Sequence, residues 1–308
     1  MTGHPPGGHR RTVTSAELDA PLMPYDVALG RITGAFTPLP ALRVPLASAL
    51  GLVLADDIVA ADDIPAFDNS AMDGYAVRAA DIGDATELAV GEQVSEGTAV
   101  KVMTGQPIPE GADAVVPWER TDELGGGRVR IRGPVEPGRF VRPRAEDVRS
   151  GDVVSRAGTR VGPVEVGMAA AVGCGQLVVH PRPRVGVLST GDELVGVDEP
   201  IGRGRVRDAN GPLLAAIVSS LGGEVTGVER VPDDPDAVAA ALGRLAAASD
   251  LVVTSGGASV GEKDWLRVVL ERDGELDFWR IAMRPGKPVA LGRVAGTPVV
   301  VLPGNPGS

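Results

Sequence analysis

Several residue types are scarce in this sequence, and each scarcity excludes a class of protein. Cys174 is the single cysteine in 308 residues, so no internal disulfide can form, which fits a reducing compartment and favours the cytoplasm. No apolar run reaches the roughly 18 residues that a membrane-spanning helix needs. The N-terminal stretch MTGHPPGGHRRTV has no apolar segment typical of a secretory signal.

Positive charge is also in deficit, with 30 Lys and Arg residues against 41 Asp and Glu and a formal net charge of −11. Such a chain repels phosphate backbones and anionic lipids, so we expect neither nucleic acid nor a membrane as partner. A site for a small anionic substrate must therefore be built from local cations and backbone N–H groups. Aromatic residues make up only 3% of the chain, so its cores depend on aliphatic side chains.

The length suits two or three domains. Residues 15–36 and 44–50 favour helices, and residues 52–60 favour a strand. From residue 75 to 155, Gly and Pro separate short strand-like segments, which predicts a small barrel or sandwich. Its expected strands are residues 75–78, 87–90, 99–102, 114–117, 128–131, 140–142 and 153–155. A helix over 162–172 and a strand over 177–180 follow.

After Pro183 the pattern changes to alternating strands and helices, which predicts a doubly wound α/β domain with a mostly parallel sheet. The expected strands are residues 185–189, 224–231, 251–254, 278–283, 289–292 and 299–302. The expected helices are residues 213–221, a segment that begins at Pro235 after an Asp234 cap, and residues 264–272.

Four of these strands end in loops with binding chemistry. The loops begin with Thr190-Gly191-Asp192-Glu193, with SGGASVGEKD from Ser255, with RPGKP from Arg284, and with PGNPGS from Pro303. In a parallel sheet all four share the carboxyl edge, where open α/β sheets bind ligands. One Gly-rich loop alone more often serves a turn, but four in one domain predict a site.

The residue types in these loops indicate oxyanion or phosphoanhydride chemistry. Small residues and hydroxyls suit phosphate oxygens, and they are Ser255, Gly256, Gly257, Ser259 and Gly261. Cations for an anion come from Arg280, Arg284 and Lys287. Glu193 and Asp264 are hard oxygen ligands suited to Mg²⁺ beside a phosphate. The chain has no GxGxxG after the first strand, no GxSxG and no Walker A sequence.

Polar positions also gather before the α/β region. FDNSAMDG places Asp68 and Asp73 in a turn-rich stretch, which is either a simple hairpin turn or a polar loop presented to a partner surface. Arg142, Glu146 and Asp147 fall in RPRAEDVRSGDVV, where an exposed charged edge is the commoner interpretation.

Eight motifs, in order, resemble a known family. They are FDNSAMDGYAV, MTGQPIPEGADAVV, RPRAEDVRSGDVV, LSTGDEL, DDPDAV, SGGASVGEKD, RPGKP and LPGNP. From about Val44 onward the chain is similar to the molybdopterin molybdenumtransferases, the MoeA proteins, whose eukaryotic relative is the C-terminal domain of gephyrin. The resemblance implies a linking α+β domain in two segments (1–60 and 147–181), a β domain inserted at 61–146, and an α/β domain at 182–308 like that of molybdopterin adenylyltransferases. It also implies that a C-terminal β domain is missing here.

The resemblance further implies the activity. Adenylylated molybdopterin would bind at the α/β domain, molybdate would be placed on its dithiolene, and AMP would be released with the help of Mg²⁺, in a homodimer with a shared site. Its catalytic positions fall on Asp68, Thr104, Asp147, Glu193 and Asp264, with Glu193 and Asp264 as metal ligands. Its substrate-binding positions fall on Arg142, Arg280 and Arg284, and we add Ser255, Gly256, Gly257, Ser259, Gly261, Lys287, Pro303, Gly304 and Asn305 from the loops. The family usually has lysine at the positions of Arg280 and Arg284, so the charge is kept and the geometry changes.

Two alternatives to this enzyme stay open. A scaffold like gephyrin would present a peptide-binding surface and would not depend on Asp68 or Glu193. An adenylyltransferase would consume ATP with free molybdopterin. The β domain that precedes the α/β domain favours the molybdenumtransferase.

Overall fold

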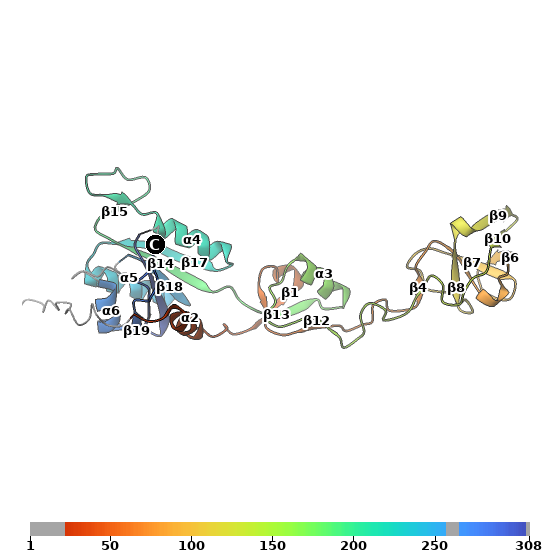
Figure 1. The fold of residues 1–308 in the computed structure, drawn as a ribbon, viewed down its shortest axis with the longest axis horizontal. Coiled ribbons are helices and arrows are strands. Elements are labelled where there is room, and N and C mark those ends of the chain that lie inside the picture. Colours follow the sequence, from red (N-terminus) through yellow and green to blue (C-terminus); the bar gives the residue numbers. More distant parts are fainter. Residues whose placement is uncertain (1–21, 257–264, 306–308) are drawn as a thin grey trace, which may run out of the picture. The chain divides into compact units, whose positions relative to one another are not determined.

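The computed structural model describes residues 22–256 and 265–305 (Figure 1). Tertiary contacts divide the chain into two compact units. Residues 1–40 and 181–308 form one of them, here called the α/β unit, and residues 41–180 form the other, here called the β unit. Within the described ranges, no helix is both long and apolar enough to cross a bilayer.

The α/β unit is built on a six-stranded sheet in the order β17-β14-β18-β21-β20-β19. The strands are β14 (Arg184–Thr190), β17 (Glu224–Val231), β18 (Leu251–Ser255), β19 (Glu275–Trp279), β20 (Ala290–Val294) and β21 (Thr297–Leu302). β14 pairs in parallel with β17 and β18, and β18 pairs in parallel with β21. β20 is antiparallel to both of its neighbours, so β19 runs in the same direction as β21. The predicted mostly parallel sheet is confirmed, and all strands except β20 end at one edge.

Helices cover both faces of this sheet, as a doubly wound fold requires. α5 (Pro235–Ala248) and α6 (Trp265–Asp273) lie on one face, while α2 (Tyr25–Gly34) and α4 (Asn210–Ser220) lie on the other. Side chains alternate between the faces along each strand. In β20, Ala290 therefore packs in the cluster of α5 and α6, and Leu291 packs with Ala28 of α2.

The start of α5 shows how the sequence sets a helix boundary. The Asp234 carboxylate accepts hydrogen bonds from the N–H groups of Asp236 and Ala237, at 3.1 and 2.9 Å. Pro235 takes the first helical position, where its missing N–H has no intrahelical partner to lose. The predicted cap is confirmed, and the helix then buries its apolar stripe against the sheet.

The β unit contains a second six-stranded sheet, in the order β8-β5-β7-β6-β10-β9. Its strands are β5 (Gly74–Val77), β6 (Ala85–Gly91), β7 (Thr98–Val102), β8 (Ala114–Pro117), β9 (Thr121–Gly125) and β10 (Arg128–Arg132). The expected barrel or sandwich is thus a single mixed sheet. β9 was not predicted because its sequence TDELG is polar and mostly exposed, and so lacks the alternation that marks a half-buried strand.

The rest of the β unit consists of smaller pieces. β13 (Gln176–His180) lies between β1 (Leu42–Pro45) and β2 (Val53–Leu54) in a three-stranded sheet. β3 (Ile58–Val59) pairs with β12 (Val153–Ser155), and β4 (Asn69–Ser70) pairs with β11 (Val141–Arg142). The remaining elements are α3 (Pro163–Ala171), the short 3-10 turns η1 (Leu46–Ser48), η2 (Ala79–Asp81) and η3 (Trp118–Arg120), and, in the α/β unit, the pair β15 (Leu194–Val195) and β16 (Val206–Arg207).

Several predicted elements were wrong in detail. The helix expected over 15–36 is α2 within the described residues, and residues 22–24 lie outside it. Residues 44–50 hold the end of β1 and one 3-10 turn instead of a helix, because Val44 pairs with Leu177 in an antiparallel ladder. Residues 52–60 hold two short strands, since the chain changes its partner from β13 to β12 between them. The strand expected over 278–283 is β19, which ends at Trp279 because Arg280 has a φ of 79° outside the strand region.

The expected domain division differs from the structure at its first boundary. Residues 22–40 belong to the α/β unit rather than to the linking segment, because Ala28 of α2 packs with Phe278 and Ile281. A backbone bridge between Met23 and Ile281 holds the start of this segment in place. The separation of a linking domain from an inserted β domain at residues 60/61 and 146/147 stays a prediction.

Candidate functional site

The middle of the α/β sheet contains a topological switch point between β14 and β18. From β14 the chain crosses to β17 on one side, and after β18 it continues to the strands on the other side. Ligands bind outside the carboxyl ends of the strands at such points. Thr190 ends β14 here, and Gly256 directly follows β18.

Gly256 packs directly against the end of β14. Its φ of 95° favours glycine, and a Cβ at this position would lie 3.0 Å from Thr190 Oγ1 and would overlap the Thr190 carbonyl oxygen. A glycine is therefore required here, because the ends of β14 and β18 approach too closely for a side chain. The Gly256 N–H donates to the Leu302 carbonyl at 3.3 Å. Gly257, Ser259, Gly261 and Asp264, which the sequence also predicted for this site, lie outside the described residues.

The exit of β21 meets the exit of β18 through a small hydrogen-bonded ring. The Ser255 hydroxyl donates to the Pro303 carbonyl at 3.2 Å. The side-chain amide of Asn210, the first residue of α4, donates to Ser255 Oγ at 2.6 Å and to the Gly304 carbonyl at 2.8 Å. Because the single hydroxyl hydrogen of Ser255 is directed at Pro303, this serine holds the loops together, and ligand donors must come from its neighbours.

The loop after β19 reaches the same place. Arg280 N–H donates to the Val289 carbonyl and Ile281 N–H to the Lys287 carbonyl, both at 2.9 Å, which closes residues 280–289 into a tight turn. Met283 and Gly286 of this turn line a cavity of about 190 Å³. The other residues that line it are Asn210, Leu213, Leu214, Ser255, Val289, Leu302, Pro303 and Asn305. The structure therefore brings the predicted segments with Ser255, Pro303 and Asn305 to one cavity, and the Arg284 and Lys287 side chains are exposed on the turn that borders it.

Glu193 is the predicted metal ligand that the structure describes. It is exposed, and its carboxylate folds back over Gly191, where a Cβ would lie 2.9 Å from either carboxylate oxygen. Its backbone carbonyl accepts a hydrogen bond from Val206 N–H at 2.8 Å, which fixes the turn. Among the described residues no cation pairs with this carboxylate, and no three acidic, His or Cys side chains group as a metal cluster.

Two hydroxyls are buried at the switch point. Thr190 is 5% exposed and Thr254 is fully buried, and neither Oγ1 has a hydrogen-bond partner among the residues that the structure describes. Buried polar groups usually have partners, so these two hydroxyls are exceptions within the sheet. They belong to β14 and β18, the strands on either side of the switch point.

Sequence reasoning missed Asp208 and Asn210 at the start of α4. Asp208 is 8% exposed, and its Oδ1 accepts from Ser189 Oγ at 3.1 Å and from Gly211 N–H at 2.9 Å. The signal was present in the segment RDANGP, because Asp and Asn just before an apolar helical stripe are typical of a helix start. The predicted helix began at Leu213, so these two side chains were assigned to a loop.

In the β unit, three segments converge around FDNSAMDG. β4 pairs with β11, so that Asn69 lies opposite Arg142, and Gly105 N–H donates to the Ser70 carbonyl at 2.8 Å. Asp68 accepts from Arg144 N–H at 2.7 Å. The loop that carries Thr104 and the segment that carries Arg142 therefore border the loop that carries Asp68. The structure brings together these predicted residues of the β unit.

Their side chains are held by charged hydrogen bonds. Thr104 donates to Asp73 Oδ1 from its backbone N–H at 2.7 Å and from its hydroxyl at 2.9 Å, and these bonds lower the pKa of Asp73 below its usual value. Arg142 donates to Asp147 at 2.5 Å and to Glu146 at 2.7 Å, and these carboxylates raise the pKa of the guanidinium. The predicted charged edge is thus a network of paired groups, in which Asp147 neutralises Arg142.

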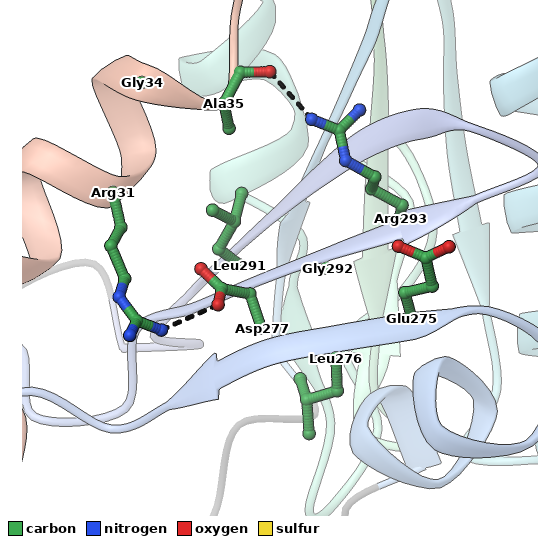
Figure 2. A pocket seen from close by; sticks show the side chains of 9 residues that line it. All are labelled: Arg31, Gly34, Ala35, Glu275, Leu276, Asp277, Leu291, Gly292 and Arg293. Carbon is green, nitrogen blue, oxygen red and sulfur yellow. Dashed lines mark hydrogen bonds and ion pairs between the residues drawn. The ribbon is translucent and has the colours of Figure 1, made fainter.

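A larger cavity, of about 590 Å³, lies elsewhere in the α/β unit, between α2 and the strands β19 and β20. Figure 2 shows Arg31 directed at Asp277 and Arg293 directed at the Ala35 carbonyl, at 2.7 and 2.8 Å. Both guanidinium groups therefore already donate hydrogen bonds to oxygen atoms of the protein. The cavity lies toward the start of β19, at the sheet edge opposite the strand exits, so its size does not make it the candidate site.

Comparisons with known protein families cover nearly the whole described chain. Residues 23–173 match the family described as MoeA N-terminal region (domain I and II), and residues 186–308 match the family described as probable molybdopterin binding domain. The two matches together include both clusters described above.

Individual relatives carry the same names. The chain is 44% identical over 286 residues to a protein of Mycobacterium tuberculosis called molybdopterin molybdenumtransferase 2, and the match covers 86% of this chain and 70% of that one. It is 38% identical over 271 residues to molybdopterin molybdenumtransferase of Haemophilus influenzae, which covers 85% and 67%. The crystal structure of a molybdopterin biosynthesis moeA protein from Pyrococcus horikosii has 33% identity and a TM-score of 0.80, with 94% of this chain and 76% of that one covered.

Proposed function

The chain belongs to the molybdopterin molybdenumtransferase (MoeA) family, and from this premise we propose that it acts in molybdenum cofactor biosynthesis. In the proposed reaction, molybdenum from molybdate is placed on adenylylated molybdopterin and AMP is released. The observation that supports this most is the convergence of the β14, β18 and β21 exits at the switch point of the α/β sheet. A loop with two exposed cations borders the same cavity.

The proposed roles in the α/β unit follow from residue chemistry. Backbone N–H groups at Gly-containing turns suit the oxygens of a phosphoanhydride. Arg280, Arg284 and Lys287 supply positive charge for an oxyanion in a chain of net negative charge. Pro303, Gly304 and Asn305 bound the other side, with Ser255 and Gly256 between the two.

The donor set is consistent with Mg²⁺ at this edge. Mg²⁺ in proteins keeps several waters and takes one or two carboxylates together with phosphate oxygens. The exposed carboxylate of Glu193 can supply one of these ligands. Glu193 would hold the ion together with Asp264. When bound, the ion would polarise the phosphoanhydride and favour attack by water.

The first test is AMP release from adenylylated molybdopterin and molybdate by the intact protein. Wild type should release AMP in a molybdate-dependent manner, and Glu193→Gln should lose most of this rate while keeping its melting temperature. Glu92→Gln, an exposed glutamate of the β unit, is the matched control and should behave like wild type. A protein that binds a peptide without any turnover would support a scaffold, and ATP consumption with free molybdopterin would support an adenylyltransferase.

We further propose that the protein is a homodimer in which Asp68, Thr104, Arg142 and Asp147 of one chain serve the α/β unit of the other. The support is chemical: the β unit carries a second cluster of charged and polar residues, in which Arg142 pairs with Asp147 and Asp68 accepts from a backbone N–H. Asp68→Ala protein should be mixed with Glu193→Gln protein under conditions that exchange subunits. Recovery of AMP release in the mixture is expected, and mixed dimers that stay inactive would refute the sharing.

A further inference from the structure

Asn210 joins three segments of the α/β unit at one point, and we propose that it is a positioning residue for the proposed reaction. The inference rests on the proposed function. It assigns to Asn210 the task of fixing the exits of β18 and β21 relative to the start of α4. Asn210 itself is not proposed to take part in bond making.

The geometry of the amide group supports this assignment. A primary amide has two hydrogens on one nitrogen, and Asn210 directs Nδ2 at Ser255 Oγ, 2.6 Å away, and at the Gly304 carbonyl, 2.8 Å away. An aspartate has the same shape and no such hydrogens. The two contacts therefore depend on the amide itself, and a single atom change removes both.

The ring of contacts is closed by Ser255. Its hydroxyl accepts from Asn210 and donates to the Pro303 carbonyl at 3.2 Å, and the residue is only 4% exposed. The ring is partly buried, with Asn210 half-buried and Gly304 exposed, and each of its donated hydrogens has an acceptor, so another arrangement of these groups loses at least one hydrogen bond. Gly256 directly follows Ser255, and the Gly304 carbonyl is itself an acceptor in this ring, so the ring sets the backbone position of both glycines.

Asp208, two residues before Asn210, holds the start of α4 in place. Asp208 accepts from Ser189 Oγ at the end of β14 and from Gly211 N–H in the first turn of α4. The start of α4 is thereby tied to β14, while Asn210 ties it to the exits of β18 and β21. The ends of β14, β18 and β21 are therefore all hydrogen-bonded to residues at the start of α4.

Alignment of this kind matters more to the rate than to substrate affinity. Donors aimed at charge that develops in the transition state act only when they are in place beforehand. A displacement of about 1 Å in a positioned group can reduce a rate on the order of 100-fold. We therefore expect Asn210→Asp and Asn210→Ala to lower kcat by roughly 10- to 100-fold with a much smaller change in KM.

The test compares both variants with Ser219→Ala, a control in the same helix whose hydroxyl donates only to Ala215 O within α4. Amide hydrogen exchange is measured on the intact protein in parallel with AMP release. In both Asn210 variants, exchange at residues 255–256 and 304–305 should rise at least about tenfold, while exchange across α5 stays as in wild type. Ser219→Ala should change neither exchange at these loops nor turnover.

The readouts separate this inference from the proposed function. Unchanged exchange at both loops in Asn210→Asp would overturn the positioning role, whatever the activity. Raised exchange with an unchanged kcat would overturn it too, because the alignment would then be irrelevant to the reaction. If wild type releases no AMP, the proposed function fails, and the exchange result alone still decides whether Asn210 fixes the loops.

Discussion

The two clusters of polar residues are held in place by different means. In the β unit, the predicted side chains are themselves bound: Asp147 pairs with Arg142, Thr104 donates twice to Asp73, and Asp68 accepts from a backbone N–H. At the strand exits of the α/β unit, hydrogen bonds hold the backbone in place, whereas the charged side chains of Arg284 and Lys287 are exposed on a turn. The difference indicates that the first cluster keeps its shape through side-chain charge, whereas the second keeps it through the close approach of Gly256 and through uncharged hydrogen bonds.

The largest effect is expected from breaking the backbone packing at the strand exits. Gly256→Ala would place a methyl group against the Thr190 carbonyl at a φ of 95°, so the β18 exit must move. We expect a loss of about 1–3 kcal/mol in the free energy of unfolding and a loss of AMP release on the order of 100-fold.

Gly243→Ala is the matched control for this substitution. Gly243 is exposed in the middle of α5, and nothing lies within 4 Å of a Cβ built there. It should leave activity unchanged and raise stability by up to about 1 kcal/mol, because alanine favours helix. Urea unfolding of both variants checks the pair, and equal stability for Gly256→Ala and wild type would show that the two exits do not pack as described.

The β unit should instead respond to the loss of charge. Asp73→Asn removes the ionised acceptor of both Thr104 hydrogen bonds, and we expect on the order of a tenfold or greater loss of AMP release as the Thr104 loop shifts. Asp84→Asn, at an exposed turn of the same unit, is the control and should have normal activity.

Comparison of Asp73→Asn with wild type also tests a pH dependence. The bonds from Thr104 lower the pKa of Asp73 below its ordinary value of 3.8. Its contribution to stability is therefore complete above pH 3.8 and is lost as the pH falls further through the lower folded pKa. Melting temperatures of wild type and Asp73→Asn should converge on acidification through that range, and a difference that stays constant with pH would contradict the assignment.

The cavity in Figure 2 offers a smaller test of what charge contributes away from the candidate site. Arg293 is half-buried and donates to the Ala35 carbonyl at the end of α2 and to the Gly296 carbonyl, at 2.8 and 3.0 Å. Arg293→Ala should lower the free energy of unfolding by about 1–2 kcal/mol, because the half-buried Ala35 carbonyl loses a charged donor. AMP release per folded molecule should stay normal, and a selective loss of activity would relocate the site to this cavity.

The smallest effect is expected at the other cation of that cavity. Arg31 pairs with Asp277 at 2.7 Å, and both side chains are more than 40% exposed. Exposed ion pairs contribute less than about 1 kcal/mol. Arg31→Ala should therefore be nearly neutral in chemical unfolding, and an effect as large as that of Arg293→Ala would mean that α2 is held mainly by charge.

The elements that could be predicted from the sequence are those with strong local signals. The α/β strands and the α5 start were predictable, because apolar runs alternate with helical stripes and Asp234-Pro235 is a strong helix signal. β9 was not, since its exposed polar residues carry no periodicity. The segment 44–50 was misassigned because pairing with β13, distant in sequence, overrode a local helical pattern.

The candidate site divides in the same way. The strand-exit motifs of Glu193, Ser255 and Pro303 were visible as Gly-rich loops after apolar runs. Asn210 was missed because its role depends on contacts with Ser255 and Gly304, which lie 45 and 94 residues further along the chain. The two hydrogen bonds from Thr104 to Asp73 were missed for the same reason, because the two residues are 31 positions apart in the sequence.

Amide hydrogen exchange on the intact protein, with and without adenylylated molybdopterin, tests directly whether the substrate binds at the strand exits of the α/β sheet. We expect slower exchange at residues 190–193, 255–256, 280–289 and 303–305, with no change around Glu275 and Arg293. Protection confined to the cavity between α2 and the strands β19 and β20, or protection nowhere in the α/β unit, would contradict this expectation.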